Sequence, residues 1–179
     1  DFGIMYSCGI IVSQKAISLI DIYNFHPGNL RDNRGSSPIN WAILLNWKAT
    51  CMSLYKIGKE IDLGELVTEH ECLIYAHDTP KCLKARLEGE IPSMLLELVD
   101  YIKRNKKGEM VSNGIYRKRI CKDDFTIKNT DSRDIINAKI RSQDDYRGAA
   151  LKVNGETYYI NSFDEYCEII DEDICKEVQ

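Results

Sequence analysis

A polar pair stands at the end of an otherwise apolar segment. The stretch "DIYNFHPG" reads as a short strand that Pro27 and Gly28 end, and Asn24 and His26 lie two residues apart within it. Side chains at that spacing point to the same side of a strand. Ligands of open parallel sheets bind outside the carboxyl ends of strands, so the pair lies where such a sheet would bind a ligand. Taken alone, the pair also fits a core histidine beside an asparagine bonded to nearby backbone.

A carboxylate follows a different predicted strand. Asp62 comes after "KIGKE" and before Leu63 and Gly64, which places it in a turn. From a turn it can lean toward an imidazole on a neighbouring strand, where it favours the charged ring and fixes its orientation. That arrangement suits a histidine acting as a base near neutral pH. An aspartate before a glycine is also ordinary turn chemistry.

The segments around these residues alternate between strands and helices. Apolar runs, turn residues and helix-capping residues set the predicted bounds. The order predicts an α/β fold built on a Rossmann-like, mostly parallel sheet with a hairpin at one edge. Strands are predicted over residues 2–12, 21–26 and the two segments flanking Asp62, and helices over 13–20, 38–47 and 79–104, the last bent near Gly89 and Pro92.

Composition changes after Arg104. The next 26 residues are polar, basic and without periodicity, which is typical of a linker. A short helix near 132–141, a turn at Asn154 and Gly155, and a capping signal at Ser162 then predict a small α+β unit. The predicted organisation is a catalytic core over residues 1–104, a linker over 105–130 and a small C-terminal subdomain over 131–179.

Composition and charge exclude several classes of protein. The 179 residues carry a formal net charge of -4, which argues against a dedicated nucleic-acid surface, although basic clusters at 103–107 and 117–119 keep that question open. The 7 cysteines form no C-x-x-C pair, which disfavours a zinc ribbon and a disulfide framework. No apolar stretch reaches the roughly 18 residues that a membrane helix needs. We therefore expect a cytoplasmic protein with no membrane partner.

The first residues look like the inside of a sheet. The chain starts at Asp1 and enters "FGIMYSCGIIV" at once, a run typical of a central strand. An open apolar edge of that kind invites aggregation. We therefore expect that further sequence precedes this segment.

Several short motifs, each of them weak alone, occur in a fixed order along the sequence. The stretch "NFHPGNLRDNRGSSPINWAILLNWKATCMSLYKIGKEIDLGELV" resembles the core of the formyltransferase family that uses 10-formyltetrahydrofolate, whose pattern is N-x-H-P, R-G, a helix, T-G-V-T and D-x-G. The resemblance extends over residues 2 to about 160 and implies that the N-terminal part of the family's domain is absent from this sequence. The positions that carry it are Asn24, His26, Pro27, Arg34, Gly35, Pro38, Trp41, Ala42, Thr50, Asp62 and Gly64.

The resemblance implies catalytic roles for three residues. Asn24 would donate to the formyl oxygen as negative charge develops, and His26 would take the proton of the attacking amine. Asp62 would orient the imidazole. No metal is required for these roles. Tyr55 departs from the family, since a histidine is common at that position, and "TCMS" replaces T-G-V-T at residues 50–53.

The same resemblance implies where the co-substrate binds. The carrier is 10-formyltetrahydrofolate, and two backbone segments would embrace its pterin ring. The residues implied are Cys8, Gly9, Ile10 and Ile11 in the first segment, and Ile57, Gly58, Lys59, Glu60 and Ile61 in the second.

Three hypotheses remain for the function. A nucleotide-linked amino sugar is the favoured acceptor, because the C-terminal stretch "DEYCEIIDEDICKEVQ" is acidic, whereas a tRNA-binding protein needs a basic surface there. The alternative is formylation of methionyl-tRNA, which the basic clusters support. The third is a degenerate, non-catalytic binding module of the same fold. The partners are accordingly a nucleotide sugar or initiator tRNA, and a homodimer is an open expectation.

Overall fold

A five-stranded sheet organises the first part of the computed structural model, which describes residues 1–144 and 146–177. The strand order is β1 (Phe2–Tyr6), β2 (Asp21–His26), β4 (Ala49–Ile57), β5 (Gly64–Leu73) and β6 (Glu109–Val111). Of these strands β1 and β2 are parallel, and the other neighbouring pairs are antiparallel. The predicted α/β class is confirmed, with a sheet that is mixed over the described chain, and the predicted hairpin is the β4 and β5 pair.

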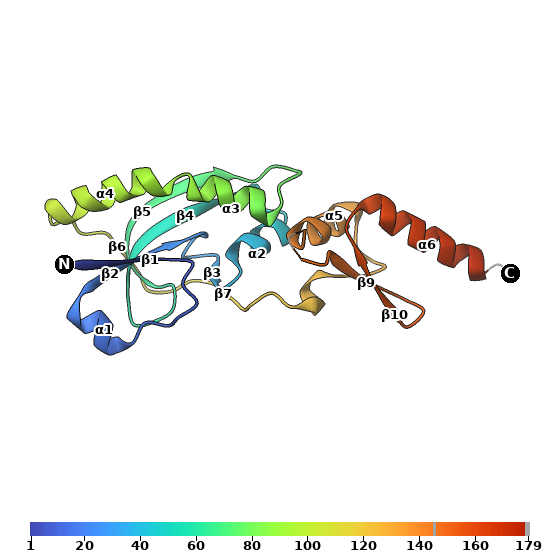
Figure 1. The fold of residues 1–179 in the computed structure, drawn as a ribbon, viewed down its shortest axis with the longest axis horizontal. Helices are drawn as coiled ribbons and strands as arrows, with labels where there is room; N and C mark the ends of the chain where they lie inside the picture. The colour runs from blue at the N-terminus through green and yellow to red at the C-terminus, as the bar shows by residue number, and fades with distance from the viewer. Residues whose placement is uncertain (145, 178–179) are drawn as a thin grey trace.

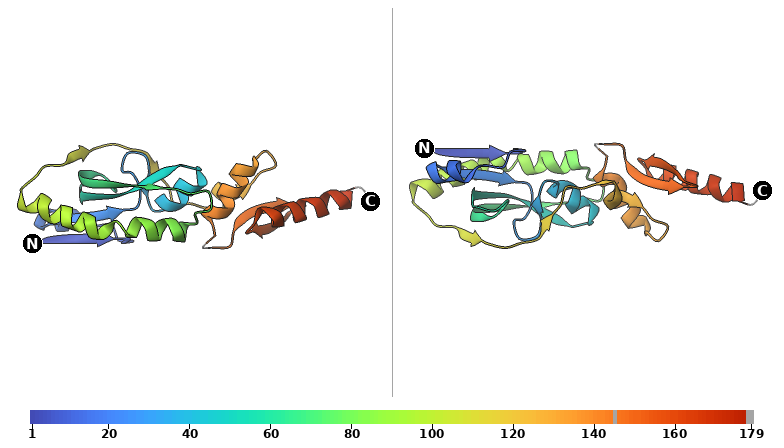
Figure 2. Two further views of the ribbon diagram at one scale, coloured as in Figure 1. Left: turned by 90° about the horizontal axis from the view of Figure 1, so that it is seen from above. Right: turned by 90° about the horizontal axis from the view of Figure 1, so that it is seen from below.

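Two consecutive helices cover one face of this sheet (Figures 1 and 2). They are α3 (Pro80–Glu88) and α4 (Ile91–Lys103). The Thr79 hydroxyl caps α3 by accepting from the backbone of Cys82. The break between the two helices at residues 89–90 confirms the bend predicted from the glycine and proline there.

The strand pleat sorts apolar from polar side chains. Phe25 of β2 pairs with Leu54 of β4, and both are buried in the core beneath α3 and α4. Their neighbours Asn24 and Tyr55 are paired as well, and they point to the opposite face because successive strand residues alternate. The core therefore holds the strands in one register, and that register presents polar side chains on the open face. Other members of this core are Met52, Leu83, Leu87, Met94 and Leu98.

The first strand is shorter than predicted. The prediction of a strand over residues 2–12 is wrong beyond Tyr6, because Ser7 has a φ of 49° and leaves the extended conformation. Ile10 and Ile11, whose apolar character extended the prediction, are 75% and 76% exposed. They belong to a loop that leads to α1 (Gln14–Leu19), whose cap is Ser13 as predicted.

The predicted linker contains secondary structure. Within residues 105–130, β6 adds to the edge of β5, and β7 (Tyr116–Arg117) pairs with β3 (Arg34–Gly35). A 3-10 turn over Lys122–Phe125 leads into β8 (Thr126–Ile127). The sequence shows no periodicity here because such short strands attach through backbone hydrogen bonds, which need no apolar pattern.

The C-terminal elements form a second, smaller core. Together with β8, it comprises α5 (Arg133–Ser142), β9 (Ala149–Val153), β10 (Glu156–Ile160) and α6 (Phe163–Glu177). The predicted turn between β9 and β10 is confirmed, with positive φ at Asn154 and Gly155. The division of the chain into units at 1–104, 105–130 and 131–179 stays a prediction, and residues 178–179 lie outside the described part.

Polar contacts join this smaller core to the sheet. Asn40 of α2 (Pro38–Leu44) donates through Nδ2 to the carbonyl of Ser142, 2.7 Å away. Arg141 donates from Nη1 to the carbonyl of Asp78 at 3.1 Å. The half of α5 nearest the sheet is thus tied to the start of α2 and to the loop before α3, as the neighbouring ribbons in Figure 1 show.

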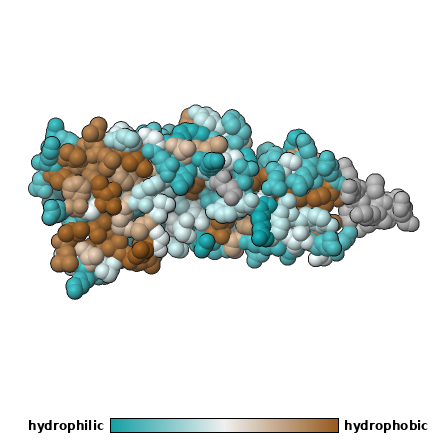
Figure 3. Space-filling view, viewed as in Figure 1, coloured by the Kyte–Doolittle hydropathy of each residue, from teal (hydrophilic) through white to brown (hydrophobic). Residues whose placement is uncertain are grey.

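Apolar side chains gather at the end of the molecule that carries β1 and α1 (Figure 3). Phe2, Ile4 and Leu19 are 44%, 48% and 72% exposed. β1 is also an edge of the five-stranded sheet, so backbone hydrogen-bonding groups and apolar surface are exposed together. Among the described helices, none combines the length and apolar character needed to cross a membrane.

Leu98 and Leu96 of α4 test which face of this helix packs on the core. Leu98 is 1% exposed and Leu96 is 74% exposed. Replacing Leu98 by Ala should lower the free energy of unfolding by about 2–5 kcal/mol, because it leaves a cavity under the helix. Leu96→Ala should change it by less than about 0.5 kcal/mol. Urea denaturation measures both, and equal losses would contradict the placement of α4.

Candidate functional site

A cavity of about 470 Å³ opens on the polar face of the sheet. Asn24, His26 and Asp62 all line it, so the structure brings the three predicted catalytic residues together. Two of them come from the end of β2 and one from the turn between β4 and β5. Nothing in the geometry by itself assigns their roles, which stay a prediction.

His26 is held by the loop that follows it. Its Nε2 lies 2.9 Å from the backbone carbonyl of Asn33, in a ring that is 4% exposed. A carbonyl oxygen can only accept, so in the neutral ring Nε2 carries the hydrogen and Nδ1 carries the lone pair. The basic atom of His26 is therefore Nδ1.

Asp62 faces that basic atom. Its Oδ1 is 3.6 Å from His26 Nδ1, and its Oδ2 accepts a hydrogen bond of 2.8 Å from the backbone of Gly35. The first distance is too long for a hydrogen bond, but a carboxylate so near stabilises an imidazolium once the ring is protonated. Asp62 has a φ of 51°, a conformation that aspartate tolerates better than most residues, and this turn aims the carboxylate inward.

Tyr55 links the other two polar residues. Its hydroxyl accepts from Asn24 Nδ2 at 3.1 Å and donates to Asp62 Oδ1 at 2.9 Å. Burial, and then the charge of Asp62, raise the pKa of Tyr55 above its ordinary value, so the hydroxyl keeps its proton and remains a donor. Asn24 has a second N–H, because one amide nitrogen carries two hydrogens. Asn24, Tyr55 and Asp62 thus form one hydrogen-bonded chain along the cavity.

The loop after β2 requires glycine at position 28. A Cβ on Gly28 would lie 2.8 Å from the Cβ of Pro38 and 3.1 Å from His26 Nε2. Asn33, which is fully buried, donates to the carbonyl of Pro38 at 2.8 Å and so fixes the loop that receives the imidazole. This close packing explains the sequence H-P-G at residues 26–28.

Both segments expected to embrace the pterin line the same cavity. The loop after β1 and the turn after β4 approach each other, and Gln14 Nε2 donates to the carbonyl of Lys59 at 3.2 Å between them. Ile61 is 46% exposed, and with the exposed isoleucines of the first loop it offers apolar surface suited to a flat ring. The lining residues from these segments are Cys8, Gly9, Ile10, Ile11, Ile57, Gly58, Lys59, Glu60 and Ile61.

Sequence reasoning missed part of this site. The sequence pattern marks Tyr55 only as a departure from the family and assigns no role to Asn33 or Tyr116, although Asn33 holds His26 and Tyr116 lines the cavity. The period-two spacing of Tyr55 and Ser53 opposite the Asn24 and His26 pair is the signal that could have placed Tyr55. Over residues 1–144 and 146–177, no three His, Cys, Asp or Glu side chains form a cluster that could hold a metal ion.

Sequence comparison supports the resemblance. No family model matches the chain. A methionyl-tRNA formyltransferase of Thermotoga maritima is 29% identical over an alignment of 177 residues that covers 92% of this chain and 56% of that protein. The chain spans about half the length of the curated relatives it matches.

Solved structures show the same fold. A sugar N-formyltransferase of a Shewanella species superposes with a TM-score of 0.73 at 20% identity, covering 90% of this chain and 68% of that one. HypX of Aquifex aeolicus, solved with tetrahydrofolic acid, gives a TM-score of 0.74 at 18% identity over 88% of this chain and 28% of HypX. The predicted resemblance to formyltransferases is therefore confirmed in sequence and in fold.

The free energy of unfolding tests the hydrogen bonds of the Tyr55 hydroxyl. Tyr55→Phe keeps the ring but removes the partner of Asn24 Nδ2 and of Asp62 Oδ1 in a part-buried site, so the free energy of unfolding should fall by about 1–3 kcal/mol. Tyr116→Phe is the control, because Tyr116 is 53% exposed. Urea denaturation of both variants gives the comparison, and an unchanged Tyr55→Phe would show that its hydroxyl makes no net contribution.

Proposed function

We propose that this chain, which shares the sequence pattern and fold of formyltransferases, moves a formyl group from 10-formyltetrahydrofolate to a primary amine. The single observation that carries the proposal is the grouping of Asn24, His26 and Asp62 at one cavity between two apolar loops. That grouping offers a hydrogen-bond donor, a base and a carboxylate. Acyl transfer to nitrogen needs these three functions.

The residues act in a defined order. As the amine nitrogen bonds to the formyl carbon, negative charge develops on the formyl oxygen, and the second N–H of Asn24 stabilises it. Nδ1 of His26 takes the proton that the amine loses, and Asp62 stabilises the resulting imidazolium. The carbon–nitrogen bond to the carrier then breaks, and the carrier nitrogen receives a proton from His26. The products are a formamide and tetrahydrofolate.

Tyr55 positions this machinery in our proposal. It fixes one N–H of Asn24 and one oxygen of Asp62, so neither side chain is free to rotate away from His26. Such preorganisation lowers the cost of orienting the groups during the reaction. Tyr55 contacts the catalytic residues and is a positioning residue.

The carrier would lie between the loop over residues 7–11 and the turn over residues 57–61. The apolar side chains of both loops suit a flat ring, and their backbone amides and carbonyls suit its polar edge. HypX, which has the same fold, was solved with tetrahydrofolic acid. That relative supports the assignment of a folate to this chain.

A nucleotide-linked amino sugar is the acceptor we favour. The chain has a net charge of -4 and an acidic C-terminal stretch, whereas phosphate-rich tRNA requires a basic surface. Methionyl-tRNA is the second candidate, because the sequence relative reported above is a methionyl-tRNA formyltransferase and residues 103–107 and 117–119 are basic. A non-catalytic module of the same fold is a third candidate. A cytoplasmic location and a homodimer stay predictions.

His26→Gln tests the base. The variant should lower kcat for formyl transfer by about 10²–10⁴-fold, because glutamine cannot take the proton. His77→Gln is the matched control, since His77 is exposed and lies outside the cavity. Initial rates with 10-formyltetrahydrofolate and an amine acceptor measure both. Equal rates for the wild type and His26→Gln would refute the assignment of His26.

A comparison of the two candidate acceptors tests the choice between them. Formylation of an amino-sugar nucleotide and of charged initiator tRNA should be assayed side by side, with filter binding of the tRNA. The sugar hypothesis expects a higher kcat/KM for the nucleotide sugar and tRNA binding that disappears as salt is raised, because any attraction would be electrostatic. Tight, salt-resistant binding of the tRNA together with its rapid formylation would favour the second candidate.

A further inference from the structure

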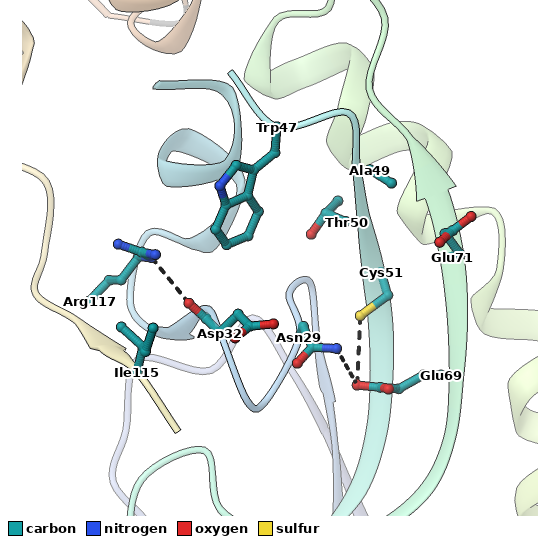
Figure 4. A pocket seen from close by; sticks show the side chains of 10 residues that line it. All are labelled: Asn29, Asp32, Trp47, Ala49, Thr50, Cys51, Glu69, Glu71, Ile115 and Arg117. Atoms are coloured by element: carbon teal, nitrogen blue, oxygen red, sulfur yellow. Dashed lines mark hydrogen bonds between the residues drawn. The ribbon is translucent and has the colours of Figure 1, made fainter. Parts of the chain in front are cut away.

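A second cavity, of about 550 Å³, lies on the same face of the sheet, along the first half of β4 (Figure 4). It shares no lining residue with the cavity of His26, and the loop over residues 28–34 separates the two. The function proposed above makes no use of it. The residues that line it are Asn29, Asp32, Trp47, Ala49, Thr50, Cys51, Glu69, Glu71, Ile115 and Arg117.

The charged groups of this cavity are mostly acidic. Among the lining residues, Asp32, Glu69 and Glu71 are acidic and Arg117 is the one cation. Arg31, which is outside the lining, forms an ion pair with Glu69. Burial raises the pKa of the Cys51 thiol to about 12, so the thiol adds no charge near neutral pH. The lining residues therefore have a formal charge of -2, or -1 with Arg31 included, and this acidic balance favours cationic ligands.

Glu69 is held rigidly at the floor. Its Oε1 accepts from Ser53 Oγ at 2.8 Å and from Asn29 Nδ2 at 3.3 Å. Figure 4 shows Glu69 between Asn29 and the Cys51 thiol, which lies 3.8 Å from the same oxygen. The Oε2 of Glu69 lies 3.4 Å from Nη1 of Arg31, whose Nη2 binds Glu109 at 2.7 Å. A carboxylate held at both oxygens keeps its position in the cavity wall.

An aromatic wall stands opposite β4. The Arg117 guanidinium lies 5.3 Å from the centre of the Trp47 ring, and its Nε donates to the carbonyl of Asp32 at 3.2 Å. These contacts occupy the cation of the lining, so Arg117 is tied to the wall. Trp47 and Ile115 leave apolar surface toward the cavity.

Thr50 supplies an independent sign of a ligand. It is 7% exposed, and its hydroxyl oxygen is buried without a hydrogen-bond partner within the described chain. Figure 4 shows the hydroxyl projecting from β4 on the side where Trp47 stands. A buried hydroxyl without a partner is destabilising, so such a group in a cavity wall is explained by a ligand that bonds to it.

We propose that this cavity is a second binding site, for a small primary amine that carries a flat apolar group. The ammonium group pairs with Glu71, beside Glu69, and the Thr50 hydroxyl hydrogen-bonds to the ligand. The apolar group lies against Trp47. The site is independent of the proposed formyl transfer, so either proposal can fail without the other.

The probe for this site is 2-phenylethylamine, titrated into the isotope-labelled full chain and followed by NMR. The proposal expects saturable shifts of the Trp47 indole and of the backbone amides of residues 49–51 and 69–71. The matched anion 3-phenylpropanoate should bind at least about tenfold more weakly, because the lining is acidic. Equal binding of the two probes, or shifts centred on residues 7–11 and 57–61, would overturn the assignment.

Glu71→Gln tests the charge. Glu71 is exposed, so the substitution should leave folding intact. It should raise the dissociation constant of 2-phenylethylamine by about three- to tenfold. Glu168→Gln, an exposed acidic position on α6, is the control and should leave the dissociation constant unchanged. Unchanged binding by Glu71→Gln would contradict the proposed ammonium site.

Thr50→Val separates a binding role from a structural one. Valine has nearly the same shape, so removing the unpartnered hydroxyl should leave the melting temperature unchanged or raise it. The same variant should weaken the binding of 2-phenylethylamine by about threefold or more, because the ligand loses one hydrogen bond. A lower melting temperature with unchanged binding would mean that the hydroxyl serves the fold alone.

Discussion

The antiparallel pairing of β2 with β4 is the constraint on which the site depends. Phe25 and Leu54 are paired and buried under α3 and α4, and this burial sets the register of both strands. A slip by one residue would turn every side chain to the opposite face. The helices that cover one face of the sheet therefore determine that Asn24 and Tyr55 stand together on the other. The register of β2 and β4 therefore determines both the packing of the core and the arrangement of the site.

The polar face then divides into two cavities along β4. The loop that begins at Gly28 forms the boundary, and its Asn33 carbonyl fixes the tautomer of His26. On one side of the loop, a tyrosine bridges an amide and a carboxylate beside an imidazole. On the other side, carboxylates face a tryptophan and a buried hydroxyl. A single loop thus lets one sheet face carry two chemically different sites.

Sequence patterns predicted the parts of the fold that local chemistry determines. The bend between α3 and α4 and the turn at Asn154 follow from residues that prefer those conformations. The strand predicted over residues 2–12 was too long because apolar Ile10 and Ile11 line a cavity in place of a core. The short strands β6 and β7 were missed because a backbone pairing with a distant segment leaves no periodic pattern. In the candidate site, Asn24, His26 and Asp62 could be named from motif and spacing. The bridging role of Tyr55 could not, since it needs the pairing of two strands distant in sequence.

The central claim is that one cavity brings a folate carrier to His26. Mapping tetrahydrofolate on the isotope-labelled chain by NMR tests it most directly. The account predicts shifts of the amides of Gly9 and Gly58 and of the His26 ring, with none at Trp47 or Thr50. Shifts confined to the Trp47 cavity, or no saturable shift of the His26 ring, would contradict it.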